Sequence, residues 1–93
     1  MLEIVYYLKG LELVNGSVST KIHVRGRDYN EECFYGDFDK NNVHEGMLEV
    51  RIISFVSNTD EAWIIPATGT FVGREYGIKV NKKYVEKRRI ETK

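Results

Sequence analysis

The sequence is short of the residues that mark secreted, membrane-spanning or helical proteins. It has a single cysteine, Cys33, so no disulfide can form within the chain. It has a single proline, Pro66, and only two alanines, at 62 and 67, although alanine is the best helix former. No apolar run approaches the roughly 20 residues needed to cross a bilayer, and residues 1–4 lack the basic start of a signal peptide. These absences predict a cytoplasmic protein with no membrane contact.

The apolar residues that are present favour β-structure. Valine, isoleucine and threonine far outnumber alanine, and β-branched side chains suit pleated, half-buried surfaces. With 42% hydrophobic and 30% charged residues, the composition is typical of a folded protein rather than a disordered one. A chain of 93 residues predicts one domain spanning 1–93, with a modest core.

Charge is balanced overall but unevenly distributed. The formal net charge is zero. Residues 74–93 contain eight Lys or Arg against three Asp or Glu, whereas residues 1–73 contain six against eleven. Two interpretations stay open: a final strand whose charges are solvated, or a contact for an anionic partner.

An Asn-Gly pair gives the clearest local signal of structure. Asn15-Gly16 predicts a hairpin with a two-residue type I′ turn, because both residues tolerate positive φ. This turn places Leu13 opposite Val18 and Tyr7 opposite Val24. The apolar side chains then share one face, and they are Tyr7, Leu11, Leu13, Val18, Ile22 and Val24. The other face carries Glu12, Ser17, Ser19, Lys21, His23 and Arg25.

The alternating strand pattern is interrupted before the hairpin turn, is weak from Gly26 to Gly46, and returns after Gly46. Lys9 interrupts the alternation, and Gly10 beside it predicts a bulge that re-aims the strand. Turn-forming residues from Gly26 to Gly46 predict a long polar loop, with Cys33–Tyr35 as a short strand inside it. Further strands are expected at 47–56, 62–65, 70–72 and 78–80, with turns at 57–60 and 73–77. Asn81 allows an alternative, a capped helix to the end of the chain.

From Val24 onward, several short motifs resemble those of Src-homology-3 (SH3) domains. Asp28-Tyr29 is similar to the end of the family's Ala-Leu-Tyr-Asp-Tyr motif, and Gly46–Val50 to its Gly-Asp-x-Leu-x-Val strand. Asp60–Trp63 resembles the turn before the family's ligand-binding tryptophan. Gly73–Ile78 and Tyr84–Lys87 resemble its final strands. The resemblance covers residues 24–88.

This resemblance implies an all-β fold, a small partly open SH3-like barrel with an added N-terminal β-hairpin. It also implies that Tyr29, Trp63 and Tyr84 converge on one surface. The chain departs from the family at two places: Ile64 follows Trp63 where a second tryptophan is usual, and residues 80–84 lack the family's proline. Recognition of proline-rich peptides is therefore not implied.

An aromatic surface favours a non-catalytic protein-interaction module or accessory subunit. Tyr29, Trp63 and Tyr84 are the predicted partner-binding residues, since amphipathic rings suit peptide contacts. The competing interpretation is that Trp63 is a core residue.

Two alternatives from other classes stay open. Nucleic-acid binding by the basic C-terminal strand would use Arg74, Lys79, Lys82, Lys83, Arg88 and Arg89. A structural homo-oligomer would pair an edge strand such as Thr70–Val72 across a symmetry axis.

Catalytic and metal-binding patterns are weak. Asp37-x-Asp39-x-Asn41 begins like a calcium loop, but the sixth position is Asn42 and the twelfth is Leu48. Cys33 lies in no local signature of a nucleophile. We expect no enzyme activity, no cofactor and no metal.

Overall fold

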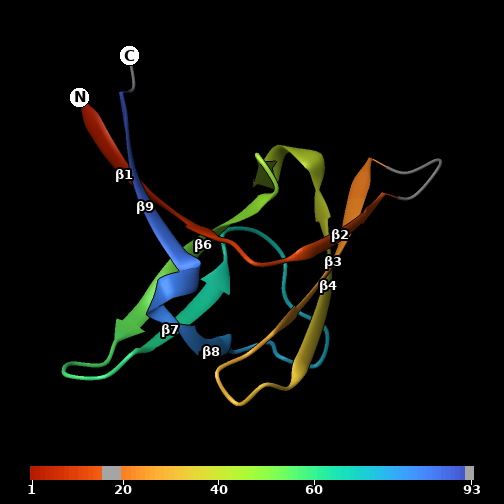
Figure 1. Ribbon diagram of the computed structural model, residues 1–93. Helices are drawn as coiled ribbons and strands as arrows, with labels where there is room; N and C mark the ends of the chain where they lie inside the picture. Colours follow the sequence, from red (N-terminus) through yellow and green to blue (C-terminus); the bar gives the residue numbers. More distant parts are fainter. Residues whose placement is uncertain (16–19, 92–93) are drawn as a thin grey trace.

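A computed structural model of the chain, which describes residues 1–15 and 20–91, contains two antiparallel sheets (Figure 1). The strands of the described residues are β1 Leu2–Leu8, β2 Glu12–Asn15, β3 Lys21–Arg27, β4 Cys33–Asp39, β5 Val43–His44, β6 Met47–Phe55, β7 Glu61–Pro66, β8 Ile78–Asn81 and β9 Val85–Glu91. Two short 3-10 helices, η1 Lys40–Asn42 and η2 Lys82–Tyr84, complete the list. Within 1–15 and 20–91, no helix is long and apolar enough to cross a membrane.

The larger sheet has the order β8-β7-β6-β1-β9, and β5 pairs with one end of β6. The smaller sheet has the order β2-β3-β4. In Figure 1 the smaller sheet lies at the right, and β1 and β9 run together to the upper left. The sheets do not close on one another. The fold is therefore all-β and consistent with a partly open barrel, as predicted.

One apolar cluster lies between the sheets. Its fully buried members come from both sheets and from the connection after β7, and they include Leu8, Val24, Phe34, Leu48, Ile64, Phe71, Ile78 and Val80. The Phe71 ring packs edge-to-face on Phe34 and Phe38 of β4, with ring centroids 5.0 and 5.5 Å apart. The connection after β7 thus forms part of the core.

Two glycines in the smaller sheet make room for these rings. A Cβ at Gly26 would lie 2.5 Å from Phe34 Cζ, and one at Gly36 would lie 2.5 Å from Phe38 Cε2. A strand residue without a side chain is required wherever an aromatic ring approaches the backbone this closely.

Gly10 lies where the chain passes from one sheet to the other. Its φ is +80°, in the left-handed region that favours glycine. β1 ends at Leu8 in the larger sheet and β2 begins at Glu12 in the smaller one. Gly10 therefore lies at a break between two strands rather than at the predicted bulge within one strand.

The N-terminal hairpin is present as β2 and β3, but its predicted register is wrong. Leu13 lies opposite Val24 rather than Val18, and Tyr7 pairs with Glu49 and Glu86 of the larger sheet. The predicted turn at Asn15-Gly16 extends outside the described residues. The predicted faces hold within β2 and β3, because a shift by an even number of residues leaves each side chain on the same face. The prediction is wrong for Tyr7, which lies in β1 and contacts His44 and Arg88 rather than the core cluster.

The long loop predicted from Gly26 to Gly46 is also wrong. Seven residues of it form β4, which continues well beyond the predicted Cys33–Tyr35. Phe34, Gly36 and Phe38 point inward in strict alternation with exposed neighbours. Gly36-Asp37 has the residue types of a turn and lies within the predicted loop. Gly36 instead lacks a side chain that would collide with the Phe38 ring.

The strands after residue 46, except the one predicted at 70–72, lie close to their predicted positions. The predicted turn at 57–60 joins β6 to β7, and Pro66 ends β7. β6 carries a register shift between Ile52 and Ser54, which explains why the alternation of apolar residues breaks there.

Two predictions about the last third are overturned. Residues 70–72 form no strand, since Phe71 makes only an isolated bridge with Arg74. The alternative C-terminal helix is absent among residues up to 91, because β9 occupies that region. Asn81 caps the short helix η2 instead, its side chain accepting a hydrogen bond from the Lys83 N–H at 3.0 Å.

Candidate functional site

Trp63 stands on the outer face of the larger sheet. Its neighbours in β7, Ala62 and Ile64, are completely buried, whereas 40% of Trp63 is exposed. Alternate residues of a strand point to opposite faces, so the core position of Ala62 and Ile64 directs Trp63 outward. The interpretation of Trp63 as a core residue is therefore overturned.

Lys79 joins Trp63 to Tyr29. It lies opposite Trp63 in the β7–β8 ladder, and its Nζ is 5.9 Å from the Trp63 ring and 5.1 Å from the Tyr29 ring. The Tyr29 N–H donates a hydrogen bond of 2.8 Å to the Lys79 carbonyl, which fixes the tyrosine beside β8. Glu61 lies 3.6 Å from Lys79 Nζ. We call Tyr29, Trp63 and Lys79 the Trp63 face.

Tyr84 lies in a different place. It belongs to η2, and its ring packs over Gly10, where a Cβ would lie 2.9 Å from Tyr84 Cδ1. Its carbonyl accepts a hydrogen bond of 2.8 Å from the Lys9 N–H. The described contacts of Tyr84 share no residue with those of Trp63 or Tyr29. The structure brings two of the three predicted aromatic residues together and places the third elsewhere.

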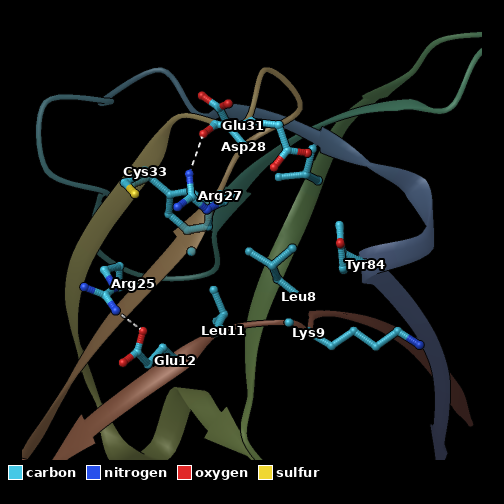
Figure 2. A pocket seen from close by; sticks show the side chains of 14 residues that line it. Leu8, Lys9, Leu11, Glu12, Arg25, Arg27, Asp28, Glu31, Cys33 and Tyr84 are labelled. Atoms are coloured by element: carbon cyan, nitrogen blue, oxygen red, sulfur yellow. Dashed lines mark hydrogen bonds and ion pairs between the residues drawn. The ribbon is translucent and has the colours of Figure 1, made fainter.

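Tyr84 forms one wall of a groove between the two sheets (Figure 2). The groove has a volume of about 430 Å³. Apolar side chains form its floor, and they are Leu8, Leu11, Phe34 and Val80. Charged residues form its rim, among them Glu12, Arg25, Arg27 and Glu31. The sequence pattern missed this groove; the glycines at 10 and 26, which open it, were the available signal.

Two arginines on the rim, Arg25 and Arg27, already have hydrogen-bond partners within the chain. Arg25 makes an ion pair with Glu12, and the hydrogen bond between them raises the pKa of the Arg25 guanidinium. Arg27 Nη1 donates to the Glu31 carbonyl at 2.9 Å. Figure 2 shows both pairs and shows Lys9 pointing away from the groove. Arg25 and Glu12 thus neutralise each other, whereas Arg27 donates to a neutral carbonyl and keeps its positive charge.

Asp28, at the top of the groove, connects separate segments of the chain through the hydrogen bonds of its carboxylate. It is 8% exposed, and its carboxylate accepts hydrogen bonds from Arg74 Nη1 at 2.8 Å and from the backbone N–H groups of Asn30 and Glu32. Burial raises the pKa of Asp28, but these hydrogen bonds outweigh it and hold the pKa below its ordinary value.

Three of the predicted nucleic-acid contacts are engaged by carboxylates. Arg74 pairs with Asp28, and Lys79 lies near Glu61. Arg88 pairs with Glu45 at 2.7 Å and with Glu86 at 2.6 Å, and these two contacts raise its pKa.

The other predicted basic residues differ in their surroundings. Lys82 Nζ donates to the carbonyls of Val56 at 2.9 Å and Thr59 at 2.7 Å, and so ties η2 to the β6–β7 turn. Lys83 Nζ lies over the Tyr84 ring at 5.1 Å. Arg89 is exposed on β9. The predicted basic residues therefore differ in whether carboxylates, carbonyls or solvent surround them.

The residues considered for metal binding or catalysis are also dispersed. Asp37 Oδ1 lies 2.6 Å from His23 Nδ1 on the outer face of the smaller sheet. Cys33 is an exposed free thiol at the start of β4, opposite Arg27. Among residues 1–15 and 20–91, no group of three or more His, Cys, Asp or Glu side chains is arranged to hold a metal ion.

No protein-family model, curated protein or solved structure matches this chain. The geometry of the chain itself is therefore the basis for any functional proposal.

Proposed function

We propose that the chain is a non-catalytic protein-interaction module, or an accessory subunit, that binds its partner through the Trp63 face. One observation carries this proposal: the single tryptophan is held outward on a sheet, with Tyr29 fixed beside it across Lys79. Large amphipathic rings on rigid strands lose little conformational freedom on binding, which is why they often dominate the energy of interfaces.

The Trp63 face is a better candidate than the groove. Leu8, Phe34 and Val80 on the groove floor are 2%, 2% and 1% exposed, so a ligand there would cover little of their surface. On the rim, Arg25 and Glu12 pair with each other. Tyr84 on the groove wall is 38% exposed and Trp63 is 40% exposed, but Trp63 has Tyr29 fixed beside it across Lys79, whereas Tyr84 packs on Gly10.

The other predicted functions have less support. The ion pairs of Arg74, Lys79 and Arg88 reduce the charge available for phosphate contacts, so nucleic-acid binding ranks second. Oligomer formation through residues 70–72 loses its basis, because Phe71 is buried. An SH3-like character and a cytoplasmic location belong to the proposal, the latter supported by the exposed free thiol of Cys33.

Capture of a partner by matched variants tests the proposal. The immobilised chain, its Trp63→Ala variant and its Tyr76→Ala variant are compared for specific partners by mass spectrometry. Tyr76 is 90% exposed and lies outside the Trp63 face, so Tyr76→Ala is the matched aromatic control. We expect Trp63→Ala to lose a partner that Tyr76→Ala retains. Equal retention by both variants, with both folded by circular dichroism, would reject the proposal.

A Tyr84→Ala variant separates the groove from the Trp63 face. If the partner is lost with Tyr84→Ala and retained with Trp63→Ala, the groove is the binding surface. The Trp63 face is then the wrong assignment.

A further inference from the structure

A second concave site lies where the first and last strands leave the body of the protein. β1 pairs with β6 only from Tyr6 to Leu8, whereas it pairs with β9 along its whole length. Leu2–Val5 and Arg88–Glu91 therefore form a two-stranded arm. Figure 1 shows this arm diverging from the β6–β7 hairpin.

A notch occupies the angle between the arm and the hairpin. It has a volume of about 400 Å³ and is lined by Tyr6, Phe55, Lys82, Val85 and Lys87. Phe55 remains 44% exposed, and Tyr6 meets it edge-to-face with ring centroids 6.0 Å apart. The notch thus has an aromatic wall at the end of β6.

The charge of the notch has one sign. Two lysines line it, and none of the described lining residues is acidic. Lys82 Nζ lies 5.9 Å from the Phe55 ring centroid, and its hydrogen bonds go to neutral carbonyls. Lys87 is exposed. Neither contact neutralises the positive charge, in contrast to the Arg25–Glu12 ion pair at the groove.

The arm extends this basic surface. Residues two apart on a strand share a face, so Arg89 lies on the same face of β9 as Lys87. Arg89 is opposite Ile4, which is 49% exposed, and Lys87 is opposite Tyr6. Arg88 lies on the other face, where Glu45 and Glu86 pair with it. Lys87 and Arg89 therefore share the face that leads into the notch, and Glu91 lies beyond them on that face at the end of β9.

We propose that this notch binds an acidic peptide segment of a partner protein, with one apolar side chain between carboxylates. The apolar side chain packs against Phe55, Tyr6 and Val85. The flanking carboxylates lie near Lys82, Lys87 and Arg89. Charge complementarity selects an acidic partner and the aromatic wall selects an apolar anchor.

A nucleic acid fits the notch less well than a peptide does. Bases stack on open ring faces. Lys82 lies over the Phe55 ring and the Tyr6 ring meets it at 68°, so less ring face is open to a flat base, whereas a small aliphatic side chain needs less open surface. The notch is separate from the Trp63 face, and this inference does not depend on the proposed function.

Fluorescence anisotropy with synthetic peptides tests the proposal. The probe is a dye-labelled, end-capped pentapeptide, Glu-Asp-Leu-Asp-Glu. One control replaces Leu by Ser, and the other replaces each acid by its amide. We expect the probe to bind at low salt and both control peptides to bind at least several-fold more weakly. Equal binding of all three peptides, or no binding of the probe, would overturn the proposal.

Protein variants locate the site. We expect Lys87→Gln to weaken probe binding by about two- to fivefold, the effect of losing one exposed ion pair. Phe55→Ala should weaken it further. Lys40→Gln, which removes an exposed lysine from η1, should leave it unchanged. An unchanged affinity in Lys87→Gln would contradict the assignment, and this exposed substitution carries little risk of unfolding.

An oligothymidine of ten nucleotides, labelled with the same dye, distinguishes the alternative ligand. Weaker binding of the oligothymidine than of the peptide supports the proposal. Tighter binding, again reduced by Lys87→Gln, would replace the peptide with a single-stranded nucleic acid as the ligand of the notch.

Discussion

At the scale of single residues, Asp28 and Arg74 join two distant parts of the chain. Their ion pair links the turn after β3 to the connection between β7 and β8, across 46 positions of sequence. Asp28 is almost completely buried, whereas 29% of the Arg74 side chain is exposed. Removing the partner of a buried charge costs more than the pair itself contributes, because the remaining charge stays away from water.

Replacing Arg74 by glutamine should therefore destabilise the protein markedly. We expect a loss of about 2–3 kcal/mol in the free energy of unfolding, below the fully buried range because Arg74 is partly exposed. Urea unfolding followed by circular dichroism measures the loss. Lys40→Gln is the control and should change stability by less than about 0.5 kcal/mol. A similar small effect of Arg74→Gln would show that the pair contributes little.

The lowered pKa of Asp28 predicts how stability depends on pH. A carboxyl group whose pKa is lower in the folded state contributes stability that is fully present above its ordinary pKa of 3.8. That contribution is lost as the pH falls through the folded-state pKa. Asp28→Asn lacks this dependence. The stability difference between wild type and Asp28→Asn should therefore shrink below about pH 4, as measured by urea midpoints from pH 7 to pH 2. A difference that stays constant over this range would contradict the assigned pKa shift.

At the scale of elements, the short helix η2 sets the direction of the last strand. The Asn81 side chain accepts the Lys83 N–H, and the Lys82 side chain reaches two carbonyls of the β6–β7 turn. η2 thereby turns the chain from β8 at one edge of the larger sheet to β9 at the other.

Loss of the Asn81 cap should destabilise the protein modestly. Asn81→Ala leaves the Lys83 N–H without its side-chain acceptor, and we expect a cost of about 1 kcal/mol. Asn81→Asp keeps an acceptor oxygen and should retain most of the stability. Thermal unfolding of the two variants compares them directly. If alanine and aspartate behave alike, the hydrogen bond is not the stabilising interaction.

Strand faces could be predicted from the sequence, whereas strand partners could not. Alternation depends only on neighbouring residues, so the inward and outward positions predicted for β3 were correct. Pairing depends on contacts distant in sequence. Tyr7 pairs with Glu49 and Glu86, and nothing near Tyr7 in the sequence indicates either residue. Gly36 illustrates the same limit, because the nearby rings that require a glycine become evident only in three dimensions.

At the scale of the whole molecule, the two sheets share one core, and the two ends of β1 differ in how many strands pair with them. β1 is central in the larger sheet from Tyr6 to Leu8, where strands pair on both sides. From Leu2 to Val5 it pairs only with β9. The same strand thus contributes to the core at one end and to a projecting arm at the other.

Hydrogen exchange should separate the two ends of β1. The amides of Tyr6–Leu8 that are hydrogen-bonded in the sheet should exchange only with global unfolding. Those of Leu2–Val5 should exchange faster, because a two-stranded ribbon is marginally stable on its own. Amide exchange followed by NMR measures both. Uniform protection along β1 would indicate that the arm is covered in solution, for example by a second copy of the chain.

The candidate site was only partly predictable at this scale. Trp63 and Tyr29 were expected to lie together, and the structure places both beside Lys79. Tyr84 was expected there too, because short motifs order residues along the chain but do not specify the face of the fold on which each one lies. The notch depends on the angle between β1 and β6, and no local pattern encodes such an angle.

The position of β1 between β6 and β9 has a consequence for protein synthesis. The ribosome makes β1 first and β9 last among these strands, so one edge of β1 stays uncovered until residues 85–91 have emerged. A nascent chain that ends before β9 would present Tyr6 and Leu8 on an open strand edge, which is the kind of surface that chaperones bind. This fold can therefore be completed only after residues 85–91 have emerged from the ribosome.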